Sequence, residues 1–170
     1  MTEAADWFVH ANYGDEAKKY RDHDVGLVYF TDNPGPVNSA SLPTRTFIYR
    51  KYRLTYFVMD IDGSNQLYFD ELKTVDAKFK RTPSLNGLSS DLQRHLISVK
   101  VDGGFTPMAG ILHTAGGVVV GVKIHGQNFG GGEKHFTKIY DNIQWITWCM
   151  RNIEINNWVY GRFNRRCVMN

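Results

Sequence analysis

The sequence predicts a mainly β, antiparallel domain with a short helix near its C-terminal end. Two observations support this: short runs of β-branched and aromatic residues recur along the chain, and glycine-rich joints at 103–104, 116–117 and 130–132 separate the later runs. Many short strands joined by glycine turns are typical of a barrel or a sandwich. The main expected strands are Val25–Phe30, Thr46–Ile61, Gln66–Leu72, Leu96–Val101, Gly117–Ile124 and His135–Tyr140.

Two further elements follow from local patterns. Asp62 and Gly63 stand between the second and third of these strands, so we expect a β-hairpin there. Residues 7–12 alternate in polarity and predict a short strand, with a helix over 15–20 as the alternative. Near the end, Asp141 is the expected cap of a helix in which Ile143, Ile146 and Met150 share one face.

Composition indicates a folded protein and excludes several classes. The chain has 170 residues, of which 42% are hydrophobic, which is enough to bury a core. The net charge of +3 is too small to indicate nucleic-acid binding by itself. No apolar run reaches the roughly 18 residues that a membrane-spanning helix needs, and the first residues lack the basic and apolar regions of a signal peptide.

Cysteine usage gives an expectation about the compartment. The two cysteines, Cys149 and Cys167, form no CxxC pair and are too few for a disulfide framework. We therefore expect a reducing, cytoplasmic environment. No cysteine–histidine cluster has the spacing of zinc ligands, so neither a metal nor another cofactor is expected.

The stretch from Thr106 to Asn128 is the most informative part of the sequence. It reads as a turn, a strand, a glycine joint and a second strand, with Gly110 directly after Ala109 and Gly121 further on. With the glycine-rich loop and helix that follow, this pattern resembles the chymotrypsin-like cysteine proteases of picornaviruses and potyviruses. The resemblance implies a six-stranded Greek-key barrel over 46–140. It also implies a partial or shortened N-terminal barrel over 1–45, and a closing helix and tail over 141–170.

The resemblance assigns catalytic positions to residues of this chain. Ala109 stands where the family carries its nucleophilic cysteine, and the backbone amides of Met108 and Ala109 would form the oxyanion hole. Asp24 would orient the catalytic imidazole, and His10 is the candidate base. A methyl group cannot attack a carbonyl, so the chain would be an inactivated variant or a natural pseudo-protease that binds peptide without cutting it.

The family's substrate pocket maps onto the second strand. Lys123 would favour an acidic side chain before the scissile bond through charge pairing, and His125 would favour glutamine. The implied partner is a peptide or viral polyprotein in the host cytoplasm. RNA phosphates are an alternative partner for the basic C-terminal residues Arg162, Arg165 and Arg166.

Two non-catalytic interpretations remain open from the sequence. Residues 60–71 resemble an EF-hand calcium loop, with oxygen ligands at Asp60, Asp62, Ser64 and Glu71. An EF-hand requires helical flanks, whereas the flanks here favour strands. The other interpretation is a β-rich binding protein without catalysis.

Overall fold

The computed structural model describes residues 6–10, 13, 23–30, 39–46, 49–81, 94–101, 109–124, 133–152, 165–167 and 169. The chain divides into two compact units, Met1–Ala40 together with Asp141–Asn170, and Ser41–Tyr140. Each unit is described by itself. Among the described residues, no helix has the length and apolar character to cross a bilayer.

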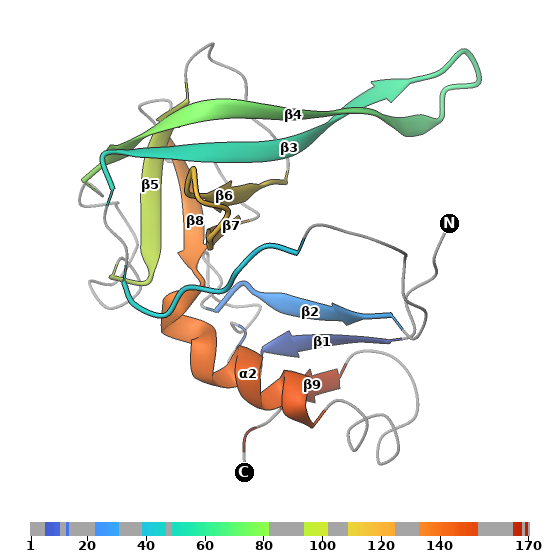
Figure 1. The fold of residues 1–170 in the computed structure, drawn as a ribbon. Coiled ribbons are helices and arrows are strands. Elements are labelled where there is room, and N and C mark those ends of the chain that lie inside the picture. The colour runs from blue at the N-terminus through green and yellow to red at the C-terminus, as the bar shows by residue number, and fades with distance from the viewer. Residues whose placement is uncertain are drawn as a thin grey trace. The chain divides into compact units, whose positions relative to one another are not determined.

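Ser41–Tyr140 contains a closed six-stranded antiparallel barrel (Figure 1). Its strands follow the order β3-β4-β5-β8-β7-β6, so β5 and β6 are consecutive in the chain but not neighbours in the barrel. This is the Greek-key arrangement that the sequence predicted. The strands are β3 (Lys51–Ile61), β4 (Leu67–Lys80), β5 (Leu96–Val101), β6 (Ile111–His113), β7 (Val119–Lys123) and β8 (Glu133–Lys138).

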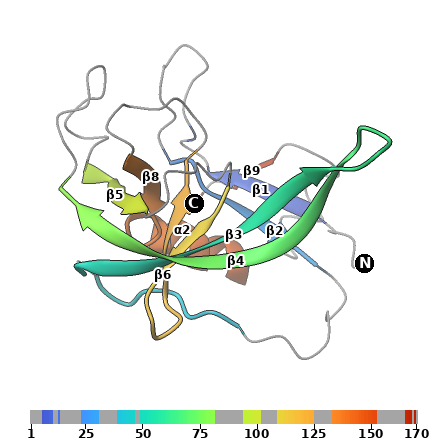
Figure 2. The ribbon, with the colours of Figure 1, turned by 90° about the horizontal axis from the view of Figure 1, so that it is seen from above.

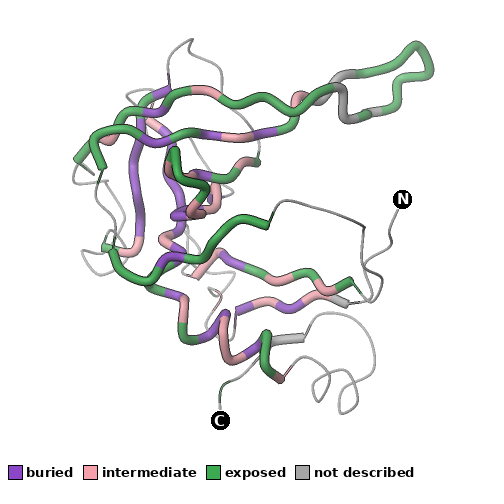
Figure 3. The backbone as a smooth tube through the Cα atoms, viewed as in Figure 1, coloured by how far each residue is buried: buried purple, intermediate pink, exposed green. Residues whose placement is uncertain are grey.

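The barrel core is filled by alternating side chains of β3 and by runs of buried residues in β5 and β8. In β3, the side chains of Tyr52, Leu54 and Tyr56 are buried, while the intervening residues are exposed or half-buried. Figure 3 shows the burial concentrated in β5, β8 and the barrel half of β3 and β4. The core is a single cluster of Tyr52, Leu54, Tyr56, Ala77, Ile97, Val99, Val101, Leu112, Val120 and Phe136.

The other unit contains a three-stranded sheet and the helix. The sheet has the order β2-β1-β9, made of β1 (Asp6–His10), β2 (Gly26–Tyr29) and β9 (Arg165–Cys167). The helix α2 (Ile143–Arg151) follows a 3-10 turn, η1 (Tyr140–Asn142). The strand expected over Val25–Phe30 forms β2, in which exposed and half-buried residues alternate and Val28 is 57% exposed.

Two details of α2 differ from the sequence expectation. Its N-cap residue is Asn142 rather than Asp141, because η1 adds a turn before the helix begins. The buried side chains are Trp145, Ile146 and Cys149, whereas Met150 is exposed. The aromatic Trp145 therefore takes the place in the packing that was expected for Met150.

The cysteines correct the expectation of free thiols. Cys149 is fully buried on α2 and is disulfide-bonded. The chain's other cysteine, Cys167, belongs to β9. The sequence argument failed because residues distant in the chain met in space. The reducing, cytoplasmic environment expected from the sequence stays a prediction.

Candidate functional site

Ala109 lies in a bend directly before β6 and is exposed. The following residue, Gly110, packs so closely against β3 that a Cβ atom would come within 2.9 Å of Leu54 Cδ1 and 3.2 Å of the Thr55 carbonyl oxygen. The Gly110 carbonyl also accepts a hydrogen bond from the Lys123 amide at 2.9 Å. The backbone after Ala109 is thus held between two strands, and the small space beside β3 favours glycine at residue 110.

The joint between β6 and β7 is the second predicted glycine position. Gly117 has a φ of +83°, a conformation that other residues rarely adopt. Its amide donates to the Thr114 carbonyl at 3.1 Å, and the Thr114 amide donates to the Val118 carbonyl at 2.9 Å. The turn therefore holds β6 and β7 in register beside Ala109.

Lys123, the predicted pocket residue, lies at the end of β7 and is half-buried. Its ammonium group donates a hydrogen bond to the Ile124 carbonyl at 2.8 Å. His125 and Met108 both lie outside the described part of the chain. The assignments of the substrate pocket and of the oxyanion hole therefore remain predictions.

The candidate base and acid belong to the other unit. His10 ends β1, is 6% exposed, and stacks on His23 with ring centroids 4.2 Å apart and planes 5° from parallel. The ring of Trp145 lies 4.7 Å from that of His10, and His23 Nδ1 is 2.7 Å from Asn142 Oδ1. The structure thus brings His10 into a buried aromatic cluster that the sequence did not indicate.

Asp24 occupies a tight turn before β2. The Val25 amide donates to the His23 carbonyl at 2.7 Å, which makes Asp24 the centre of a three-residue turn. His23 itself has a φ of +52°, which is uncommon for a residue with a side chain. The amide of His10 donates to the Val25 carbonyl at 3.3 Å, so the backbones of the two candidates are neighbours. Ala109 falls in the barrel unit, and its relation to this pair stays a prediction.

A buried histidine that the sequence analysis missed lies in β8. His135 is 2% exposed, and its Nδ1 lies 2.7 Å from Ser98 Oγ of β5. Burial, together with the smaller effect of the positive charges of Lys123 and Lys134, lowers the pKa of His135 from 6.5 to about 4. No sequence signal marks it, because the strand alternation alone does not distinguish it from a surface residue.

His135 makes the stability of the barrel pH-dependent. Below pH 6.5 the unfolded chain binds a proton at this histidine, whereas the folded chain binds it only near pH 4. Because the unfolded state then binds more protons, the free energy of unfolding should fall as the pH decreases from about 6.5 to about 4. Urea unfolding at several pH values measures this slope. His135→Gln should remove this dependence of the unfolding free energy on pH, and Lys123→Met should reduce it. An unchanged pH dependence in both variants would contradict the role of His135.

The flanks of residues 60–71 are not those that an EF-hand requires. The residues on both sides of the loop are strands β3 and β4, paired from Lys51↔Lys78 to Ile61↔Leu67, and not helices. Asp62 Oδ1 accepts hydrogen bonds from the amides of Ser64 (2.8 Å) and Gln66 (2.9 Å), and closes a hairpin turn. Glu71 pairs instead with Lys73 at 2.8 Å. Among the described side chains, no three His, Cys, Asp or Glu residues gather to hold a metal ion.

Comparisons with known proteins agree with the barrel. No protein-family model and no curated protein matches the chain. Solved structures do match. Kallikrein-related peptidase 10 in complex with Zn²⁺ aligns with a TM-score of 0.64 and 15% identity over 89% of this chain and 74% of its own. The scabies mite inactivated protease paralogue S-I1 aligns with a TM-score of 0.65 and 15% identity, over 87% of this chain and 68% of its own. Neuropsin, a serine protease of mouse brain, aligns with a TM-score of 0.64 and 14% identity, over 88% of this chain and 71% of its own.

Proposed function

The chain has the chymotrypsin-like fold, and we propose that it is a non-catalytic protein of this fold that binds extended peptide segments beside Ala109. The observation that carries the proposal is the exposed Ala109 on a backbone fixed by Gly110. Backbone amides of a fixed turn can bind a peptide carbonyl, but a methyl group supplies no nucleophile. One protein of similar fold is named an inactivated protease paralogue, which shows that this barrel exists without activity.

The finer expectations of a viral origin and a cysteine-type ancestor do not enter the proposal. The similar structures are a kallikrein-related peptidase, a mite paralogue and a mouse serine protease, and they support the chymotrypsin-like fold rather than the viral cysteine type. The proposal keeps the pairing of Lys123 with an acidic side chain of the bound peptide.

Peptide binding and hydrolysis are tested separately. We expect the wild-type chain to leave a fluorescence-quenched peptide library uncut, and to bind peptides with an acidic residue more tightly than those with a neutral one. Lys123→Glu should reverse that preference through like-charge repulsion, whereas Lys100→Glu, an exposed lysine elsewhere in the barrel, should not. Hydrolysis by the wild type would overturn the inactivity, and absence of any peptide binding would overturn the binding.

The microenvironment of residue 109 is tested with an introduced thiol. Ala109→Cys should react with iodoacetamide well below the ordinary cysteine pKa of about 8.5 if a histidine lies beside it. Ala115→Cys is the matched control, because Ala115 is also an exposed alanine, in the turn between β6 and β7. Equal pH profiles for the two thiols would mean that no activated site exists at residue 109.

A further inference from the structure

A row of three lysines crosses the outer face of the barrel on β3, β4 and β5. Lys51 pairs with Lys78, Lys78 pairs with Lys100, and all three are exposed. The rows next to it on these strands face the barrel core and contain Tyr52, Ala77, Phe79, Val99 and Val101. Since successive residues of a strand point to opposite faces, the lysine row points outward. It lies at the barrel end of the β3–β4 pair, away from the hairpin tip (Figures 1 and 2).

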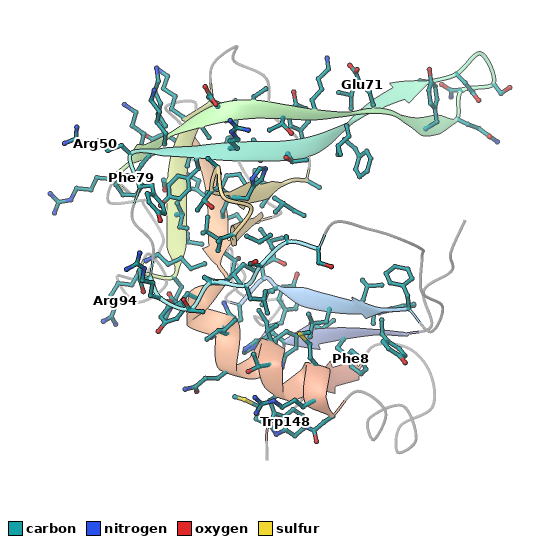
Figure 4. The ribbon with its side chains drawn as sticks, viewed as in Figure 1. Phe8, Arg50, Glu71, Phe79, Arg94 and Trp148 are labelled. Atoms are coloured by element: carbon teal, nitrogen blue, oxygen red, sulfur yellow. The ribbon has the colours of Figure 1, made fainter. Side chains whose placement is uncertain are left out.

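Two more cations extend this row along the strands. Arg53 stands two residues after Lys51 on β3, and Lys80 stands two residues after Lys78 on β4, so both share the outer face and both are exposed. Because β3 and β4 are antiparallel, Arg53 and Lys80 lie on opposite sides of the row. Figure 4 shows Arg50 at the same end of the β3–β4 pair. We call Lys51, Arg53, Lys78, Lys80 and Lys100 the basic face.

Positive charge exceeds negative charge on this face. Among the described residues at this end of the strands, the carboxylates that share the face are Asp76, opposite Arg53, and Glu133, opposite Lys100. Like charges that are directly opposed destabilise a sheet. The pairing of Lys78 with a lysine on each side therefore lowers the stability of the barrel, and a bound anion would relieve this repulsion.

The spacing of the cations suits a chain of anionic groups better than a single ion. Neighbouring strands lie about 4.8 Å apart, so the backbones at Lys51 and Lys100 are about 10 Å apart. At about 3.3 Å per residue, Arg53 and Lys80 are about 13 Å apart along the strands. One small anion can contact only part of such a surface, whereas a polyanion that crosses the strands meets all three lysines.

The surroundings of the row indicate which polyanion fits. β4 and β5 already have a neighbouring strand on each side, so they offer a peptide no free edge for strand addition. Within β3, β4 and β5, the outer-face residues that flank the row are Arg53, Asp76, Lys80 and Ser98, and none is an aromatic on which a nucleic-acid base could stack. A lysine ammonium binds an anion as a point charge, without a required planar geometry. The face therefore favours a partner that is recognised by its charge alone.

We propose that the basic face binds a sulfated polysaccharide, which crosses β3, β4 and β5 and places its sulfate groups against the lysine row. The bound chain brings negative charge to the one place in the barrel where three lysines oppose one another. Lysines clustered on one surface are a common electrostatic footprint of polyanion binding.

Calorimetric titration with a short heparin oligosaccharide measures this binding at salt concentrations between about 0.05 and 0.5 M. We expect the Kd to rise with salt, and its logarithm to be linear in the logarithm of the salt concentration, because binding releases the counterions of the polyanion. The same oligosaccharide without its sulfate groups should bind at least about tenfold more weakly.

The double variant Lys51→Gln with Lys100→Gln tests the row. It should bind heparin at least about tenfold more weakly, and its salt slope should be smaller by about two, because about one counterion fewer is released for each lysine lost. Lys73→Gln with Arg151→Gln is the matched control. It removes the same charge, but Lys73 lies on the opposite face of β4 and Arg151 on α2. The control should keep the wild-type Kd within about twofold.

The same double variant separates binding from a structural role. Removal of the two lysines that oppose Lys78 should raise the urea midpoint of unfolding, because it relieves the repulsion. Heparin should raise the midpoint of the wild type more than that of the variant. A variant that lost both heparin binding and stability would show that the lysines support the barrel itself, and the proposal would be wrong.

Other results would also contradict the proposal. One is a wild-type chain that binds no heparin at low salt, and another is equal binding of the sulfated and desulfated chains. A single-stranded oligonucleotide or polyglutamate of equal charge that bound more tightly than heparin would assign the face to nucleic acid or to an acidic polypeptide instead. Because Ala109 and Lys123 are not part of the basic face, none of these outcomes depends on peptide binding.

Discussion

Replacing Phe136 with alanine is expected to lower the free energy of unfolding by about 3–5 kcal/mol. Phe136 is completely buried in β8, where it is paired with Ile97 of β5 on one side and with Lys123 of β7 on the other. Its side chain therefore packs in the barrel core, on a strand that has neighbours on both sides. Loss of the ring removes its burial and leaves a cavity that a closed barrel cannot readily collapse.

The matched control for this substitution is Phe30→Ala. Phe30 is 44% exposed and follows β2 in the other unit, so the same chemical change should cost far less, within about 1 kcal/mol. Urea unfolding followed by circular dichroism at a β-sheet wavelength compares the two variants. Similar losses for both phenylalanines would contradict the position of Phe136 at the centre of the core.

Reduction of the disulfide at Cys149 is expected to cost about 3 kcal/mol. With Cys167 as the partner, the closed loop has on the order of 20 residues, and the loop-closure model gives about this value. The thiol of Cys149 would then lie fully buried on α2 beside the core of its unit. Heat unfolding with and without dithiothreitol measures the loss. Tryptophan fluorescence is the appropriate probe, because Trp7, Trp145, Trp148 and Trp158 all fall within Met1–Ala40 and Asp141–Asn170.

Cys149→Ala distinguishes the disulfide from other effects of the reductant. The variant should be less stable than the oxidised wild type and insensitive to dithiothreitol. If the reductant lowered the unfolding temperature of both proteins equally, the cause would lie elsewhere. An unchanged wild type would mean that the bond adds no stability.

The comparison of sequence and structure is clearest for the hairpin. Two runs rich in β-branched and aromatic residues on either side of Asp62-Gly63 predicted a hairpin, and the structure has its two strands. The same residues also matched the spacing of calcium ligands, and only the structure shows that Asp62 accepts hydrogen bonds from the turn. Ligand spacing is a property of the sequence, but whether a carboxylate is available depends on the backbone around it.

The sequence by itself predicted the barrel, because short runs of β-branched and aromatic residues separated by glycine joints favour many short antiparallel strands. The resemblance to the viral proteases also assigned Ala109 to the position of the nucleophile, and this assignment stays a prediction. Only the tertiary structure decided which distant groups meet. The disulfide of Cys149, the stacking of His10 on His23, and the lowered pKa of His135 each depend on packing between elements far apart in the chain. Local patterns do not encode such contacts, because burial and proximity arise only once the strands have closed and the helix has packed.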